Sequence, residues 1–263
     1  MKLVKKKIYP LLIFFIFMII LFLGRRGYNN VICKAIEVEI EQAEYAIISQ
    51  EQIKDYLFKN FKEEILNKKI REINIYKIEK ILSQNPYIEQ VKLDINNEGI
   101  LKIKIKQSKP IVKIISEAGE FYLSSTGNIM KAIPSKNQYI IVANGAIDNL
   151  DLSFDKKVNI NSLDREKNSS IFVIFAIAKE LNNEKFLSKF FTQIYLKDAH
   201  NVFLVPRLGE FVVIVGDTND LSEKFSKLHV FLDHIDKIGW NRYSAINLSY
   251  ANQIVCTKNK NKK

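Results

Sequence analysis

Three histidines, two cysteines and one tryptophan are the residues of this chain that most often take part in chemistry. His229 and His234 share a segment with helical periodicity, and a spacing of five residues separates them by about 140° around a helix. They therefore do not face one metal ion together, and His200 precedes Asn201 in a predicted turn. The spacing indicates surface or packing histidines and predicts no metal site.

The two cysteines give no sign of catalysis. Cys33 and Cys256 fall in segments that we assign to different domains, so we expect two unpaired, structural thiols. Nothing near Cys256 in the sequence would lower the pKa of its thiol. The motifs G-x-S-x-G, H-E-x-x-H, G-x-G-x-x-G and the P-loop are missing from the sequence. We therefore predict no catalytic residue, no cofactor and no small-molecule substrate, which disfavours a secreted hydrolase.

The net charge of +11 invites a nucleic-acid function. However, the lysines are scattered over predicted strands and helices and do not gather with aromatic residues into one stripe. This distribution is typical of solvated faces, so we predict no nucleic-acid partner. Residues 258–263 form a lysine-rich polar tail that at most touches anionic lipid.

Residues 8–24 form an uncharged, strongly apolar run. About 16 apolar residues make a helix of roughly 24 Å, near the lower limit for crossing a bilayer. The run has no small-residue cleavage site, which favours an uncleaved anchor over a signal peptide. Lysines in residues 1–7 outnumber Arg25 and Arg26 on the other side, so the positive-inside rule predicts a cytoplasmic tail, with the bulk of the chain outside beyond a linker of residues 25–33.

Hydrophobic spacing after the linker predicts the order strand, helix, helix, strand, strand. A strand over 31–40 is followed by Ser49 and Gln52, which have the spacing of a capping box and start a helix. A second helix covers 75–84 and ends before Pro86. Two strands with period-two alternation, around residues 91–95 and 101–105, are joined by a turn that contains Gly99.

From Pro110 onward strands dominate, so the fold class is α+β with a mostly antiparallel β-domain and flanking helices. The alternation predicts strands over 111–116, 120–124, 138–143, 191–197, 201–205 and 210–215. Helical spacing predicts helices over 168–182 and 221–235. Alternation of apolar residues predicts a final strand over 243–257.

The final strand is the candidate site, because a sheet edge is a binding feature that needs no catalyst. Its side chains alternate at Ile246, Leu248 and Tyr250, followed by Ile254. If the strand lies at an edge, its unpaired amides can accept a strand from another chain. An internal position with neighbours on both sides is the alternative. Trp240, which precedes the strand, fits packing and recognition equally well.

Several segments in this order resemble the FtsQ family of bacterial cell-division proteins, called DivIB in some bacteria. They are NPYIEQVKL, ILKIKIKQSKPIVKI, FYLSSTGNIM, VPRLGEFVVIVGD, EKFSKLHVFL and INLSYANQIVC, and the last three are similar to Bacteroidetes-type members. The resemblance covers essentially the whole chain, although no single segment is diagnostic.

The resemblance implies a POTRA domain over residues 34–107 and a β-domain over 108–257. It further implies a non-enzymatic, single-pass scaffold of the inner membrane, mostly periplasmic, which recruits FtsB- and FtsL-like proteins at the division site. In the family, the partner adds a strand to the last β-strand. The partner-binding residues that we expect on this basis are Tyr250, Ile246, Leu248, Ser249, Gln253, Ile254 and Trp240.

Two positions of the last strand depart from the family pattern, and near the POTRA boundary Gln107 and Ser108 stand where the family often has an acidic-arginine pair. The tyrosine of the family's D-L-R-Y strand falls on Tyr250, but Asn247 replaces the acidic residue and Ser249 the arginine. Charged contacts made elsewhere in the family are therefore in doubt here. A POTRA-type docking or chaperone module with no link to division would also bind its partners by strand addition at an open sheet edge. The sequence therefore does not separate the two functions.

Overall fold

The computed structural model describes residues 13–21, 31–41, 47–133, 140–150 and 157–260. Residues 13–21 are helical and exposed, and the rest of the anchor predicted over 8–24 lies outside the described residues. Among the helices of these ranges, none has both the length and the hydropathy required to cross a bilayer. The membrane anchor therefore stays a prediction.

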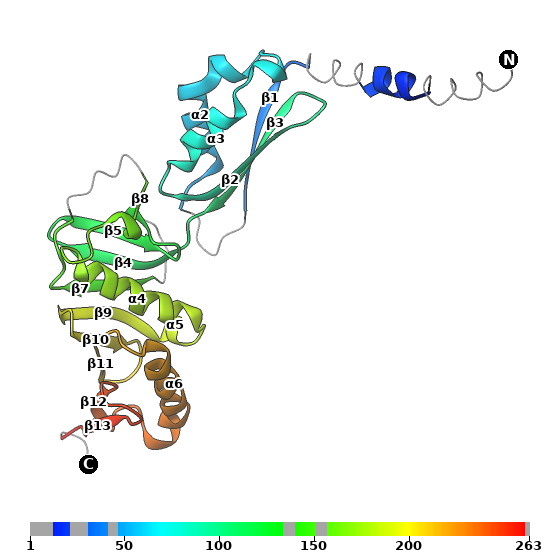
Figure 1. Cartoon of the computed structure of the whole chain (residues 1–263). Coiled ribbons are helices and arrows are strands. Elements are labelled where there is room, and N and C mark those ends of the chain that lie inside the picture. Colours follow the sequence, from blue (N-terminus) through cyan, green and yellow to red (C-terminus); the bar gives the residue numbers. More distant parts are fainter. Residues whose placement is uncertain (1–12, 22–30, 42–46, 134–139, 151–156, 261–263) are drawn as a thin grey trace, which may run out of the picture. The chain divides into compact units, whose positions relative to one another are not determined.

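The chain divides into two compact units (Figure 1). The first unit runs to Gln84 and includes Gln90–Gln107. The second contains Asn85–Glu89 and the chain from Ser108 onward.

The first unit has the predicted order of elements. These are β1 (Ala35–Ile40), α2 (Gln50–Ile65), a short 3-10 helix (Ile70–Glu72), α3 (Ile75–Ser83), β2 (Ile88–Ile95) and β3 (Ile100–Gln107). The three strands form one sheet in the order β1-β3-β2, with β1 parallel to β3. The central strand β3 buries Leu101, Ile103 and Ile105 completely.

Side-chain caps explain where the helices of this unit begin. The backbone N–H of Gln52 donates to Ser49 Oγ at 3.2 Å, and the N–H of Ser49 donates to Gln52 Oε1 at 2.8 Å. This reciprocal pair confirms the predicted capping box. At the start of α3, Asn74 Oδ1 accepts a hydrogen bond from the N–H of Lys77 at 2.9 Å.

The turn between β2 and β3 requires its glycine. Gly99 has a φ of +83°, and a Cβ at this position would collide with the carbonyl oxygen of Ile32. Asn96 Oδ1 accepts from the N–H groups of Glu98 and Ile100 and closes the turn. The predicted hairpin is therefore present.

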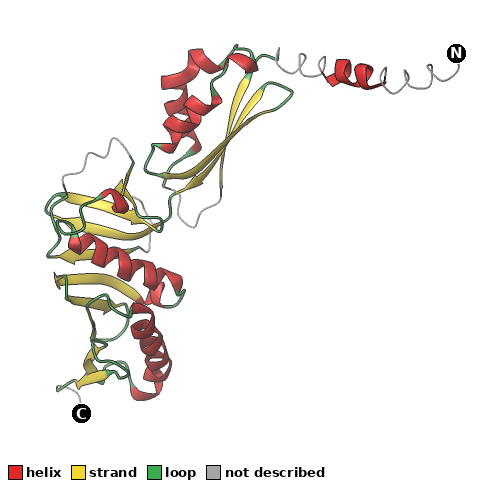
Figure 2. Cartoon of the chain, viewed as in Figure 1, coloured by secondary structure: helices red, strands yellow, loops and turns green. Residues whose placement is uncertain are grey.

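The second unit is a ten-stranded sheet with helices packed against it (Figure 2). The strand order is β13-β12-β11-β10-β9-β7-β4-β5-β6-β8. The strands are β4 (Pro110–Ser116), β5 (Gly119–Ser124), β6 (Asn128–Lys131), β7 (Ile141–Gly145), β8 (Val158–Asn159), β9 (Phe191–Asp198), β10 (Asn201–Pro206), β11 (Val212–Gly216), β12 (Tyr243–Asn247) and β13 (Val255–Lys258). The helices are α4 (Ser169–Asn183), α5 (Leu187–Phe190) and α6 (Leu221–Ile238), with a 3-10 helix at Ile160–Ser162.

Helical crossovers determine the topology of this sheet. Strands β9, β10 and β11 form the predicted antiparallel meander. In contrast, β4 is parallel to β7, β7 to β9, and β11 to β12. Parallel neighbours need a long connection, and α4 with α5 joins β7 to β9 whereas α6 joins β11 to β12. The sequence predicted α4 and α6 but neither α5 nor the parallel pairs.

One hydrophobic core holds the second unit together. It combines buried residues of α4 and α6, such as Ile174 and Leu228, with residues of the strands, such as Val112, Ile194 and Leu204. Burial of one such side chain contributes about 1.5–3 kcal/mol. The same core extends to Ile246 of β12, so the end of the sheet that carries the candidate site is anchored in it.

Candidate partner-binding edge

The segment predicted as one final strand is two strands. Strand β12 ends at Asn247 and β13 begins at Val255, so the prediction of a continuous strand over 243–257 was wrong. The intervening residues 248–254, here called the β12–β13 loop, turn through Asn252, which has a left-handed φ of 58°. Asparagine adopts this conformation more readily than most residues.

Strand β12 is an inner strand of the sheet. It pairs in parallel with β11, where Val213 is opposite Ile246, and antiparallel with β13 on its other side. The side chains of Ile246 and Leu248 are completely buried. For this half of the segment the internal alternative is correct, and neither side chain is presented to a partner.

Strand β13 is the open edge. In the described part of the chain, it has β12 on one side and no strand on the other. The N–H of Asn259 donates to the carbonyl of Arg242 at 2.9 Å, toward β12. Backbone groups alternate in direction along a strand, so the N–H and C=O groups of Cys256 and Lys258 point away from β12. These are the groups that an added strand would meet.

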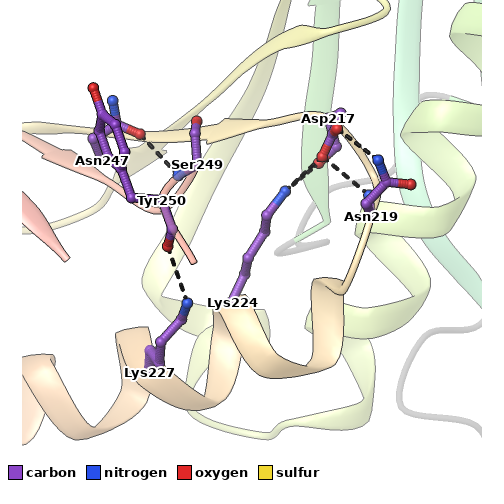
Figure 3. A network of polar contacts seen from close by, with 7 residues as sticks. All are labelled: Asp217, Asn219, Lys224, Lys227, Asn247, Ser249 and Tyr250. Atoms are coloured by element: carbon purple, nitrogen blue, oxygen red, sulfur yellow. Dashed lines mark hydrogen bonds and ion pairs between the residues drawn. The ribbon is translucent and has the colours of Figure 1, made fainter. Parts of the chain in front are cut away.

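The exposed predicted residues lie in the β12–β13 loop and not on a strand. Tyr250 is 50% exposed, and Ser249 and Gln253 are also exposed. The N–H of Ser249 donates to Asn247 Oδ1 at 2.9 Å, and Lys227 Nζ of α6 donates to the carbonyl of Tyr250 at 3.3 Å (Figure 3). These bonds hold the loop in one position beside the open edge.

A second polar cluster fixes the start of α6 (Figure 3). This is the helix to which Lys227 joins the β12–β13 loop. The nearly buried Lys224 donates through Nζ to Asp217 Oδ1 at 2.7 Å and to the Asp217 carbonyl at 2.9 Å. Asn219 donates to the same carboxylate through its side chain at 2.7 Å. The hydrogen bond from Lys224 is the main cause that lowers the pKa of Asp217, so this carboxylate stays charged at neutral pH.

Trp240 and Ile254 pack inward. Both are partly buried against the core of the second unit. The ring of Trp240 lies 5.6 Å from that of Phe190. The structure therefore favours the packing interpretation of Trp240, whereas a contact between either residue and a partner stays a prediction.

Chemical groups for catalysis or metal binding do not gather at this edge. Cys33 and Cys256 are both free thiols, as predicted. Across the ranges that the structure describes, no group of three or more histidine, cysteine or acidic side chains is arranged to hold a metal ion. What the edge offers is a row of backbone donors and acceptors beside an ordered loop.

Two family models match the chain. The model described as "FtsQ/DivIB, C-terminal related" matches residues 109–257. This range covers more than half of the 263 residues. The chain belongs to the FtsQ/DivIB family. A second model, described as a POTRA-like domain, matches residues 31–106, and no curated protein matched the chain in a similarity search.

Membership of the FtsQ/DivIB family supplies the general function. Its members are non-enzymatic scaffolds of the bacterial cell-division machinery, which act through contacts with other division proteins. The FtsQ/DivIB match includes both β12 and all but the last residue of β13. The open edge is therefore part of the family domain.

The FtsQ/DivIB resemblance did not lead us to the edge residues themselves. The sequence pointed to Tyr250 as a strand residue, but it lies in the loop, and Val255, Cys256, Thr257 and Lys258 form the edge. The segment Ala251-Asn252-Gln253 could have revealed the break, because it interrupts the apolar alternation at an asparagine.

Proposed function

We propose that this chain is a membrane-anchored divisome scaffold that captures FtsB- and FtsL-like proteins by strand addition along β13. Residues 8–24 would be the anchor, with residues 1–7 cytoplasmic and both units periplasmic, at the division site of the inner membrane. The observation that carries the proposal is the open edge of β13, which belongs to the domain that the FtsQ/DivIB family model matches.

The length of β13 limits the contribution of the backbone. An added strand would meet the outward N–H and C=O groups of Cys256 and Lys258, about four hydrogen bonds that contribute roughly 0.5–1.5 kcal/mol each. A micromolar contact requires about 8 kcal/mol, so apolar contacts must supply the rest. Val255 of β13 and Tyr250 of the β12–β13 loop, which are 41% and 50% exposed, are large apolar side chains that could supply them. A shared membrane would also raise the local concentration of the partner.

Two other edges of the described sheets, β8 and β1, are less suited to this function. Strand β8, at the far end of the ten-stranded sheet, has only two residues. In the first unit, the outer strand β1 carries Glu37 and Glu39, which lie within 4.0 Å of Lys102 and Lys104 of the neighbouring strand. Charged side chains on an edge strand discourage unspecific pairing.

Replacement of Lys258 by proline tests the proposal. Proline removes an outward N–H without loss of a bond to β12, so Lys258→Pro should prevent strand addition and leave the sheet intact. Lys258→Ala keeps the N–H and controls for loss of the side chain. FtsB- and FtsL-like proteins of the same bacterium would be co-purified with each full-length variant, and circular dichroism would monitor folding. Undiminished capture by Lys258→Pro would overturn strand addition at β13.

A POTRA-type docking or chaperone function without a link to division is the second candidate. In the three-stranded sheet of the first unit, the outer strand β2 has a described strand on one side only, which favours a docking role for that unit. A fluorescent fusion separates the two functions. A band at midcell supports the scaffold, whereas a uniform signal around the cell supports the docking module.

A further inference from the structure

An open groove of about 550 Å³ lies in the second unit, away from β13 in sequence and formed by different elements. Short α5, the segment that precedes it and the turn between β10 and β11 form its walls. We call it the α5 groove, and its main lining residues are Lys185, Phe186, Lys189, Phe190, Arg207 and Leu208. Its volume lies within the range of roughly 300–1,000 Å³ that is usual for ligand pockets.

Aromatic packing makes the floor of the groove rigid. Phe190 is only 5% exposed, and its ring stacks on that of Phe186 with a centroid distance of 5.3 Å. The ring of Trp240 also lies 5.6 Å from that of Phe190. In contrast, Phe186 is 43% exposed and Leu208 is 59% exposed. The groove therefore has a fixed aromatic floor and two apolar side chains that face solvent.

The exposure of Leu208 is imposed by the turn that carries it. The backbone N–H of Arg207 donates to the Phe190 carbonyl at 2.7 Å, and Arg207 Nε donates to the Lys189 carbonyl at 3.2 Å. Gly209 has a φ of +91°, and a Cβ there would lie 2.6 Å from the Phe211 ring. A leucine held in water by a rigid turn is pre-organised for an apolar contact.

The charges around the groove select the type of occupant. Lys185, Lys189 and Arg207 are exposed cations at its rim, and Lys189 and Arg207 also make contacts within the chain. The carboxylate of Glu184 is already engaged, because it accepts from the N–H of Leu187 at 2.8 Å and lies 3.4 Å from His229 Nδ1.

Glu210, in the turn between β10 and β11, adds a second carboxylate to that of Glu184. The three cations of the rim still outnumber these two carboxylates, so the net charge of these five residues is positive at neutral pH. A positive rim around an apolar hollow complements an acidic segment with an apolar side chain.

We propose that the α5 groove binds a short acidic peptide segment of another protein. An apolar side chain of the peptide lies between Phe186 and Leu208, and flanking carboxylates meet the positive rim at Lys185. A bilayer surface would meet the same charges, but the apolar side chains line a hollow, which suits an inserted side chain better than a flat surface. This site is independent of strand addition at β13.

Trp240 gives a direct readout, because it is the one tryptophan of the chain and contacts the floor of the groove. The probe is a fluorescein-labelled peptide in which Leu-Phe is flanked on both sides by Asp-Glu. With the full-length chain, we expect saturable anisotropy, and the unlabelled peptide should shift the emission of Trp240. A peptide with Lys-Lys in place of each Asp-Glu should bind at least about tenfold more weakly, because it meets a rim of like charge.

Substitutions on the wall and the rim locate the site. Leu208→Ser and Lys185→Glu should each weaken the acidic peptide about tenfold, through lost apolar burial and reversed charge respectively. Val230→Ser is the matched control for the first, since Val230 is 60% exposed on α6 and does not line the groove. Lys167→Glu, at an exposed site before α4, is the control for the second. Neither control should change the affinity.

Two results would overturn the proposal. The first is equal affinity of the wild type and the Leu208→Ser and Lys185→Glu variants for the acidic peptide, or no binding at all. The second is that vesicles of phosphatidylglycerol, but not the peptide, bind the wild type more strongly than Lys185→Glu, which would make the groove a lipid contact. Capture of FtsB-like proteins should be normal in Leu208→Ser, so the result is separate from the test of β13.

Discussion

The ammonium group of Lys227 donates a hydrogen bond to the backbone carbonyl of Tyr250 at 3.3 Å (Figure 3). This bond joins α6 to the β12–β13 loop. Lys227 is held in place by Glu223, one helical turn earlier, at 3.1 Å. The position of the exposed tyrosine ring therefore depends on a side chain of the helix and not on the loop alone.

Removal of this bond should loosen the loop. In Lys227→Ala we expect backbone hydrogen exchange of residues 249–253 to accelerate about fivefold, which corresponds to roughly 1 kcal/mol for one hydrogen bond from a charged donor. Mass spectrometry of exchanged peptides would measure the change. Lys227→Arg keeps a cationic donor and serves as the control. Unchanged exchange in Lys227→Ala would mean that the loop is ordered by other contacts.

Tyr250 should matter for capture of the partner more than for folding. Its side chain is half exposed, so Tyr250→Ala should change the free energy of unfolding by no more than about 0.5 kcal/mol. An aromatic residue at the centre of an interface often contributes about 2 kcal/mol or more to binding, so capture of FtsB-like proteins should fall at least tenfold. Circular dichroism and a pull-down would test both parts. Tyr250→Phe separates the role of the ring from that of the hydroxyl.

The Asp217–Lys224 pair predicts a dependence of stability on pH. The pKa of Asp217 is lowered from its ordinary 3.8 in the folded state, chiefly by the hydrogen bond from Lys224. Its contribution to the free energy of unfolding is therefore present above about pH 4 and is lost as pH falls through the lower folded pKa. Asp217→Asn should destabilise the second unit by about 1–2 kcal/mol at pH 7, because the nearly buried Lys224 loses its negatively charged acceptor.

Denaturant unfolding of the wild type and Asp217→Asn at pH 7 and near pH 3 would measure this difference. The two curves should lie closer together at the lower pH. A constant difference between the variants over this range would contradict an ionised pair. Asn219→Ala, which removes a neutral donor from the same carboxylate, should have a smaller effect.

The reactivity of the two thiols can report whether a partner covers the open edge. Burial raises the pKa of both Cys33 and Cys256, so each is mostly protonated at neutral pH and should react slowly with iodoacetamide. The rate should rise with pH until the pKa is passed. Cys33 is completely buried, whereas Cys256 is partly exposed on β13, so Cys256 should react first. Addition of an FtsB-like partner should protect Cys256 and leave Cys33 unchanged.

The first unit was largely predictable because its signals are local. The Ser49–Gln52 cap, the asparagine-glycine turn around Gly99 and the strict alternation through Leu101, Ile103 and Ile105 each specify structure within a few residues. The helices and the antiparallel meander of the second unit follow from the same kind of pattern. These elements agree with the structure to within a few residues.

The edge of the large sheet was not predictable in the same way. Whether Ile246 lies in an inner strand depends on its pairing with Val213, which is distant in sequence. Alternation of apolar residues reports that a face is buried and says nothing about how many neighbours a strand has. The break at Asn252 and the groove beside Leu208 likewise depend on turns whose surroundings come from remote segments.

The parallel pairing of β11 with β12 also has a consequence for the order of assembly. Only three residue pairs join the two strands, Val212 with Ala245, Val213 with Ile246 and Ile214 with Asn247. The chain that joins them, which includes all of α6, must loop back before they meet, and closing so long a loop costs more chain entropy than closing the tight turn between β9 and β10. We therefore expect the meander to nucleate and β12 with β13 to dock late, so that the edge becomes available only on a finished domain.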